Sequence, residues 1–184
     1  MSASSAYSRW KANPSIRDSK VCNNLPMCGR YRLSRRKQII EEHFDAAEWQ
    51  DDWSPRYNIA PTQPVPAIRQ HPNEPIRQLS LMKWGLIPHW AKDASGASST
   101  INARSETAAT KPAFRDPLKF RRCLIPTDGF YEWLPAHRNS KQPYCFEVND
   151  GDLFAFAGFD VVFGAWLAVL MIRQRQPSVY GSTA

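Results

Sequence analysis

The chain has 184 residues, of which 42% are hydrophobic, 12% aromatic and 22% charged. This composition is sufficient for one medium-sized domain with a hydrophobic core, and it excludes collagen-like, coiled-coil and fully disordered chains. The formal net charge of +7 suggests an anionic partner, but a solvated basic surface would give the same charge.

The first 26 residues show no hydrophobic periodicity, and we predict that residues 1–26 form a disordered or mis-annotated N-terminal extension. They lack the apolar stretch of a secretory signal peptide. The four cysteines are too few and too irregularly spaced for a disulfide scaffold or a zinc site. We therefore expect a reduced, cytoplasmic protein with no metal and no cofactor.

Ser34 is expected to cap a short helix over residues 35–46. The apolar stripe of this helix would consist of Ile39, Ile40, His43 and Phe44. Three cations at 35–37 would lie in the first turn, where the helix macrodipole disfavours positive charge. They either serve a partner such as phosphate or only keep the surface soluble.

The remaining elements are mainly strands. Six prolines between Pro55 and Pro75 predict strand edges and turns, followed by a strand-like run over 79–88 and a polar loop over 92–100. A short helix should begin near Ser105. Further strands are expected over 122–125, 127–134, 144–148 and 153–159, with a hairpin turn at 149–152. We predict an α+β fold, mainly antiparallel β-sheet with short flanking helices.

From Val161 the composition changes to an apolar run that ends at Ile172, followed by a polar tail. This run is shorter than the roughly 20 residues that span a bilayer. Extending it back to Leu153 would bury Asp160 at a cost of about 2.5–3.5 kcal/mol. We therefore expect no membrane partner, keep a membrane span only as the weaker alternative, and interpret residues 161–184 as an atypical segment produced by a frameshift or a truncated gene.

Two segments carry side chains that suggest chemistry. Asn102 and Arg104 place an amide and a guanidinium beside the expected strand-to-helix junction, where backbone N–H groups favour anions. Glu132 stands among three aromatic residues, and burial there should raise its pKa and suit it for proton transfer near neutral pH. The alternatives are that Asn102 caps a turn and that Glu132 faces water.

Basic residues also gather in two clusters, each of which is either a phosphate-binding surface or an ordinary solvated surface. The first cluster contains Arg30, Arg32, Arg35, Arg36 and Lys37. The second contains Arg104, Lys111, Arg115, Lys119, Arg121 and Arg122.

Five motifs follow one another in the first part of the chain: Met27–Tyr31, Arg56–Thr62, Trp84–Pro88, Ile101–Thr107 and Asp128–Trp133. In this order they resemble the SOS-response-associated peptidase (SRAP) family, the abasic-site processing proteins. The resemblance implies an incomplete SRAP-like domain over residues 27–160. It also implies a monomer that binds single-stranded DNA and crosslinks itself to abasic sites in the DNA damage response, with associated peptidase activity. Such a protein would be nucleoid-associated in a bacterium and nuclear in a eukaryote.

The resemblance also implies roles for individual residues. The family's nucleophile is an N-terminal cysteine, matched here by Cys28, whose amine and thiol would together close a thiazolidine on the abasic sugar. Asn102 would orient the amine or the sugar, and Glu132 would shuttle protons. Arg30 and Arg104 match phosphate-contacting arginines. The residues that line the DNA groove and interrupt base stacking would be Asn58, Pro61 and Trp90.

Two departures from the family pattern leave other functions open. Cys28 follows 27 residues, so its nitrogen is an amide unless Met27 is the true start or the chain is cleaved after it. The family's His-Asp-Arg motif has no counterpart among His43, His71, His89 and His137. The alternatives are a catalytically impaired, non-covalent DNA-binding remnant and a conventional cysteine protease, which would need a histidine paired with Cys28.

Overall fold

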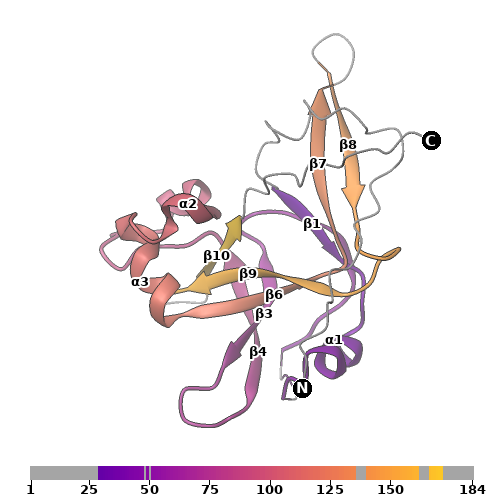
Figure 1. The fold of residues 1–184 in the computed structure, drawn as a ribbon, viewed down its shortest axis with the longest axis horizontal. Coiled ribbons are helices and arrows are strands. Elements are labelled where there is room, and N and C mark those ends of the chain that lie inside the picture. The colour runs from indigo at the N-terminus through magenta and orange to yellow at the C-terminus, as the bar shows by residue number, and fades with distance from the viewer. Residues whose placement is uncertain (1–28, 48, 50, 136–139, 162–165, 172–184) are drawn as a thin grey trace, which may run out of the picture.

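The computed structural model describes residues 29–47, 49, 51–135, 140–161 and 166–171. Within these ranges the chain forms two β-sheets and three short α-helices (Figure 1). The predictions made for residues 1–26, Cys28, His137 and the polar tail lie outside the described residues.

The first sheet has four strands in the order β2 (Arg56–Ile59), β1 (Arg30–Leu33), β7 (Gly129–Pro135) and β8 (Lys141–Phe146). The second sheet has six strands in the order β4 (Arg77–Trp84), β3 (Pro64–Gln70), β6 (Arg122–Thr127), β9 (Phe154–Asp160), β10 (Trp166–Met171) and β5 (Asn102–Arg104). The pairings are antiparallel except those of β10 with β4 and with β5, which are parallel. The predicted α+β fold with mainly antiparallel sheet is confirmed.

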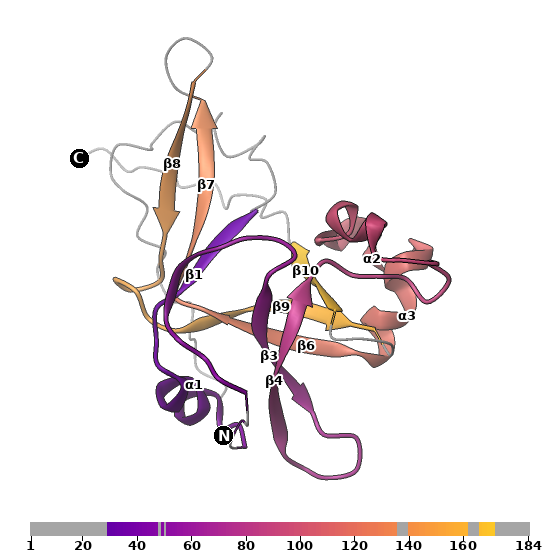
Figure 2. The same ribbon diagram turned by 180° about the vertical axis from the view of Figure 1, so that it is seen from behind.

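The helices are α1 (Lys37–Phe44), α2 (Ser105–Ala108) and α3 (Pro112–Phe120), and a 3-10 turn, η2, covers Ser95–Ser99. Helix α3 begins with Pro112, whose fixed φ and missing N–H suit a first helical position. Helices α2 and α3 lie together at one end of the six-stranded sheet, and α1 lies apart from them (Figure 2). The short helix expected near Ser105 is thus present.

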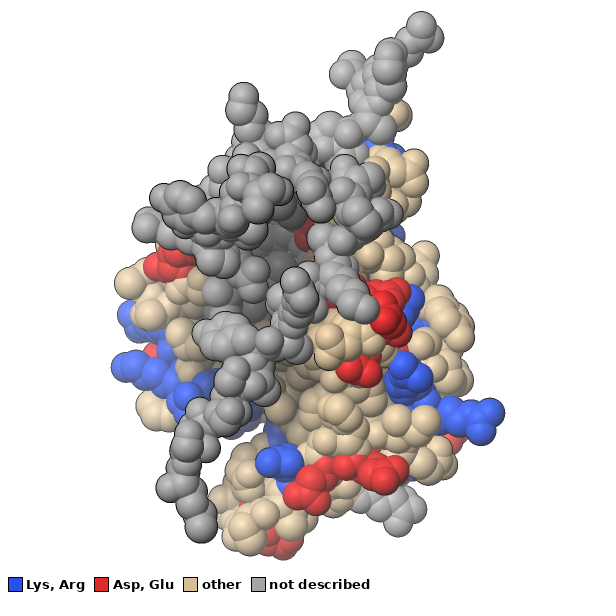
Figure 3. Space-filling view, turned by 45° about the vertical axis from the view of Figure 1, so that its right-hand side comes forward, with Lys and Arg blue, Asp and Glu red and all other residues tan. Residues whose placement is uncertain are grey.

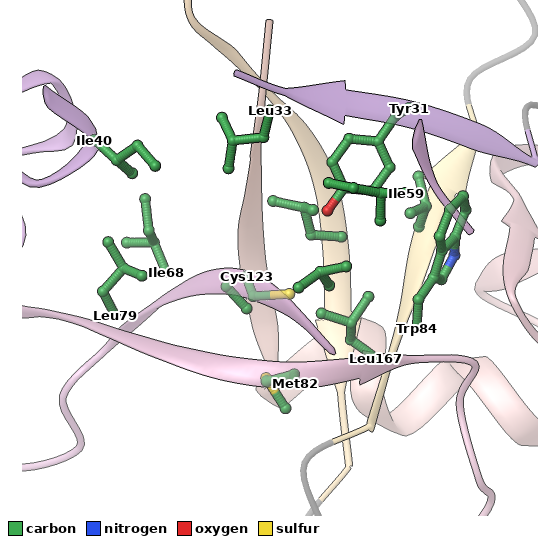
Figure 4. Packing of buried hydrophobic residues seen from close by; sticks show 14 of the residues in the cluster. Tyr31, Leu33, Ile40, Ile59, Ile68, Leu79, Met82, Trp84, Cys123 and Leu167 are labelled. Atoms are coloured by element: carbon green, nitrogen blue, oxygen red, sulfur yellow. The ribbon is translucent and has the colours of Figure 1, made fainter. Parts of the chain in front are cut away.

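The main hydrophobic core lies between the two sheets. Tyr31, Leu33 and Ile59 enter it from the four-stranded sheet, and Trp84 and Leu167 enter it from the six-stranded sheet (Figure 4). Each large apolar side chain that is fully buried contributes about 1.5–3 kcal/mol relative to its exposed state. A second cluster packs α2 and α3 against the other face of the six-stranded sheet and contains Leu86, Ala103, Ala108, Phe114, Phe159 and Ala168.

The apolar run that begins at Val161 supplies a strand of this sheet. Strand β10 pairs with β9, β4 and β5, so that β4, β3, β6, β9 and β10 close on themselves. Closure removes exposed strand edges, which would otherwise favour aggregation. In the part of the chain that the structure describes, no helix is long and apolar enough to cross a membrane.

The predicted turn at residues 149–152 forms, but the prediction that it joins two paired strands of a hairpin is wrong. Asn149, Asp150 and Gly151 have φ values of 42°, 63° and 100°, as expected for left-handed turn residues. The strands on either side do not pair with each other: β8 pairs with β7 in one sheet, and β9 pairs with β6 and β10 in the other. The turn chemistry reverses the chain locally, but β9 has its strand partners, β6 and β10, in the other sheet, where Phe159 is fully buried.

The predicted start of the first helix is also wrong. Helix α1 begins at Lys37 after Arg36, and no side chain caps it. Ser34 instead donates from its backbone N and its hydroxyl to Asp128, at 2.7 and 2.6 Å. Of the predicted apolar stripe Ile40 is fully buried and Phe44 packs against the core partly buried, whereas Ile39 is 45% exposed.

Candidate active site

The register between β1 and β7 determines which side chains face the interior. Tyr31 lies opposite Phe130, and Arg30 lies opposite Tyr131. Directly opposed residues share a sheet face, and side chains two apart on one strand point the same way. Glu132 therefore shares the inner face of the four-stranded sheet with Tyr31 and Phe130.

Glu132 is buried in this inner face and is only 4% exposed. Burial, which penalises the charged form, raises the pKa of the carboxyl group from 4.5 to about 7. Its Oε2 atom has no hydrogen-bond partner within the described residues. The expectation of a raised pKa is confirmed, and the alternative that Glu132 faces water is wrong. The structure thus places an acid that can exchange a proton near neutral pH inside the protein.

Asn102 approaches the same interior from the other sheet. It lies opposite Val169, a member of the core cluster between the sheets, and is 7% exposed. The preceding residue, Ile101, accepts a hydrogen bond at 2.9 Å from the indole nitrogen of Trp84. The Trp84 ring meets the Tyr31 ring edge-on, with 5.5 Å between their centroids (Figure 4). Asn102 and Glu132 therefore face the same inter-sheet layer, which also holds Tyr31 and Trp84.

The turn after β2 lies beside Trp84. Thr62 donates its backbone N–H to the Trp84 carbonyl at 2.7 Å, and Trp84 donates to the Gln63 carbonyl at 3.1 Å. Thr62 has φ 68°, so the turn depends on a left-handed residue. These bonds bring Pro61, in the same turn, close to the strand that carries Trp84.

The other predicted groove residues are more exposed. Asn58 is exposed at the end of β2, and Trp90 is 54% exposed in the loop between β4 and η2. The Trp90 ring contacts His89 edge-on, at 4.8 Å between centroids. Both side chains are accessible to a ligand, and their role in DNA binding stays a prediction.

The two predicted phosphate contacts differ in their surroundings. Arg30 begins β1, is partly buried and donates to the Gly29 carbonyl at 3.1 Å. Arg104 ends β5 and is exposed immediately before α2. Within the first basic cluster, Arg32 is bound to Asp128 and to Glu147, at 2.9 and 2.7 Å. On the face drawn in Figure 3, basic and acidic side chains are interspersed, so local contacts matter more than a continuous basic field.

The cysteines that the structure describes are poor nucleophiles. Cys123 is buried, and this burial raises the pKa of its thiol to about 12. Cys145 is exposed as a residue, but partial desolvation of its sulfur again raises the thiol pKa. A thiolate is the reactive form, so neither group is activated at neutral pH. The predicted nucleophile, Cys28, lies outside the described residues.

Sequence reasoning assigned no role to Tyr31, Trp84 or Asp128, although each lies in one of the five motifs. Tyr31 and Trp84 are fully buried between the sheets, and Asp128 is fully buried where the chain passes from β6 to β7. The alternation of Tyr31 with Arg30 and Arg32 was a signal for its inward direction. No pattern in the sequence indicated the partners of Asp128.

Comparisons with known proteins find relatives over most of the chain. The model of a family described as SOS response associated peptidase (SRAP) matches residues 27–168, which include all five motifs. The abasic site processing protein YoaM of Bacillus subtilis is 42% identical over 134 residues, which are 72% of this chain and 58% of that protein. The abasic site processing protein YoqW of the same species is 40% identical, over 72% of this chain and 59% of its own length.

Relatives of lower identity also match a large part of the chain. The abasic site processing protein HMCES of Mus musculus is 37% identical over 110 residues, which are 53% of this chain and 31% of that protein. A crystal structure of a protein from Bordetella bronchiseptica superposes with TM-score 0.65 and 27% identity, over 79% of this chain and 72% of that chain. One from Bacteroides thetaiotaomicron, at 23% identity and TM-score 0.67, shares the fold over 79% of this chain and 68% of its own. The chain spans 58% to 60% of the Bacillus subtilis relatives it matches.

Proposed function

The chain belongs to the SOS response associated peptidase family, and from this membership we propose that it captures abasic sites in single-stranded DNA through a covalent bond to Cys28. The similar curated proteins are named abasic site processing proteins, and this name supplies the substrate class. The reaction follows from the chemistry of an N-terminal cysteine. An abasic sugar in its open form carries an aldehyde, and an amine and a thiol on one residue both react with aldehydes.

The proposed reaction needs no oxidant and no cofactor. The α-amine, with an ordinary pKa of about 7.7–8.0, attacks the aldehyde carbon and forms a carbinolamine. Loss of water gives an imine. The thiol then adds to the imine: sulfur bonds to the carbon, and the thiol proton passes to the nitrogen. The product is a thiazolidine, and one water is released overall.

The observation that carries the proposal is the buried position of Glu132 and the raised pKa of its carboxyl group. Because its pKa is about 7, both forms are populated near neutral pH, so the group can take a proton from the amine and give one to the departing water. The register that pairs Arg30 with Tyr131 brings the start of β1 alongside Glu132. Cys28 is two residues before Arg30 in the sequence. Asn102, facing the same inter-sheet layer, would orient the amine or the sugar.

The DNA strand would be held by residues around this layer. Arg30 and Arg104 would contact phosphates, and the turn that contains Pro61 would line the groove with Asn58. Trp90, which is 54% exposed, would interrupt the stack of bases. Stacking on an aromatic ring contributes about 1–3 kcal/mol per base without sequence preference. The protein should therefore recognise the lesion and not the flanking bases.

The reaction requires a free amine on Cys28. We propose that the peptide bond between Met27 and Cys28 is cleaved, by initiator-methionine removal from a start at Met27 or by the peptidase activity for which the family is named. Intact-mass spectrometry of protein purified from cells measures the processed fraction. A preparation consisting only of chains that begin at Met1 would rule out this step.

The crosslink is tested with a single-stranded oligonucleotide that carries one abasic site and with the same strand intact. We expect a shifted band that resists denaturation with the abasic strand only. Cys28→Ser should abolish the band, whereas Cys145→Ser, which removes a thiol on β8, should leave it unchanged. Salt-sensitive binding without any crosslink would instead support the non-covalent remnant. Peptide cleavage that depends on Cys28 and persists without DNA would support a conventional cysteine protease.

A further inference from the structure

Asp128 stands where the chain passes from the six-stranded sheet to the four-stranded sheet, between β6 and β7. Its carboxylate is fully buried, yet donors surround it. Oδ1 accepts from Arg32 Nε at 2.9 Å, and Oδ2 accepts from the backbone N and the hydroxyl of Ser34 at 2.7 and 2.6 Å. Arg35 Nε lies 3.7 Å from Oδ2. Every one of these donors belongs to β1 or to the residues that follow it.

Backbone groups reinforce the same junction. Asp128 donates its N–H to the Arg32 carbonyl at 3.2 Å, and the Thr127 hydroxyl donates to that carbonyl at 2.9 Å. Gly129, the first residue of β7, donates to the Thr127 hydroxyl at 3.2 Å. Charge-assisted hydrogen bonds are roughly twice as strong as neutral ones. The junction therefore holds β1 against the first residue of β7 more firmly than the strand ladder alone would.

Strand β1 needs such a fixed point because it has only four residues. On its other side, the pairing with β2 is irregular between Tyr31 and Leu33. A slip of one residue in a β-ladder turns every side chain to the opposite face. A slip of β1 on β7 would therefore change which residue at the start of β1 lies beside Glu132.

We infer that Asp128 is the positioning residue of the proposed site: by binding Arg32 and Ser34 it sets the register of β1 on β7 and so places the start of β1 beside Glu132. This inference rests on the proposed function, because the reactive amine would stand at the start of β1. The contacts of Asp128 are with Arg32 and Ser34, and the inference assigns it no contact with the reacting atoms. It acts at the other end of the same short strand.

Asp160 offers a matched control. It is buried to the same degree, and its carboxylate lies 2.9 Å from Arg69 Nη1 and 3.7 Å from Arg121 Nη1. It ends β9 in the six-stranded sheet, and its two ion-pair partners lie in β3 and directly after α3. Removing its charge therefore disturbs a buried ion pair without touching the junction of β1 and β7.

The test measures crosslinking by the full chain under single-turnover conditions, with saturating abasic oligonucleotide and well below the unfolding temperature. Asp128→Asn places an amide N–H₂ group against one of the donors. We expect the rate constant to fall on the order of 10²-fold, as for a small misplacement of reacting groups, while affinity for the intact strand stays within about twofold. Asp160→Asn should keep the wild-type rate constant. A variant that is only destabilised would form less crosslinked product in total, but its folded fraction would react with the wild-type rate constant.

Two further measurements make the result decisive. Ser34→Ala removes one donor only and should lower the rate constant by a smaller factor, in case Asp128→Asn does not fold. In Asp128→Asn and in Ser34→Ala, amide hydrogen exchange should become faster at residues 30–33 and stay unchanged at residues 157–160. The inference would be overturned if Asp128→Asn and Ser34→Ala both kept the wild-type rate constant. It would also be overturned if hydrogen exchange at residues 30–33 were unchanged in both of these variants. If the wild-type chain forms no crosslink, the proposed function fails, and hydrogen exchange still decides whether Asp128 sets the register.

Discussion

Replacing Glu132 by glutamine should make the protein more stable and less active at the same time. The carboxyl group has an ordinary pKa of 4.5 and, because it is buried, a folded-state pKa of about 7. Glutamine has nearly the same shape but carries no charge at any pH. The substitution therefore removes the cost of burying the carboxylate and, with it, the group that would move protons.

The sign and size of the stability change follow from these two pKa values. Between pH 4.5 and about 7 the folded protein keeps a proton that the unfolded chain has lost, so the wild-type free energy of unfolding falls as pH rises. At about 1.4 kcal/mol per pH unit, the fall amounts to about 3.5 kcal/mol and is complete above pH 7. Glu132→Gln should match the wild type at pH 4 and be more stable by about this amount at pH 8.

Urea denaturation of both proteins at half-unit steps from pH 4 to pH 8.5 measures the difference. Glu74→Gln, at an exposed loop position, serves as the control and should change stability by less than about 0.5 kcal/mol throughout. The crosslinking rate of Glu132→Gln should fall by about 10²- to 10⁴-fold, the usual contribution of a general acid or base. A stability difference that does not vary with pH would refute the argument that burial raises the Glu132 pKa.

Three other substitutions test separate parts of the structure. Arg104→Ala, at an exposed position, should weaken binding to any single strand and lower the slope of log affinity against log salt by about one unit in a titration. Leu167→Ala, at a fully buried position in β10, should reduce the free energy of unfolding by about 2–5 kcal/mol in urea, whereas an unchanged midpoint would contradict the place of β10 in the core. Gly85→Ala should destabilise by about 1–3 kcal/mol in the same assay, because Gly85 has φ 141° and an added Cβ would lie 2.7 Å from the Ala97 carbonyl oxygen.

Local sequence patterns predicted most of the strands, because strand formation there depends mainly on residues that are close together in the chain. The proline-rich region after Pro55 is extended, and the helix near Ser105 begins where expected. Glu132 is another local success, because three aromatic neighbours in the sequence already indicated burial. The alternation of side chains along a strand carries this information over a few residues only.

The errors arise where distant segments meet. Ser34 has the composition of a helix cap, but its hydroxyl binds Asp128, 94 residues away, because a buried carboxylate needs donors more than an exposed helix end does. The turn at residues 149–152 has hairpin chemistry, yet the strands it joins pair in different sheets.

The sequence by itself determined the family, through the order of five motifs that lie inside residues 27–168, and it named Cys28, Asn102 and Glu132 as candidates for the chemistry. Only the tertiary structure decided that Asn102 and Glu132 face one inter-sheet layer, and that Asp128 holds β1 against β7. The physical reason is the distance along the chain over which each kind of interaction acts. Propensity and turn chemistry act between near neighbours, whereas burial and strand register depend on contacts between segments that are far apart in the chain.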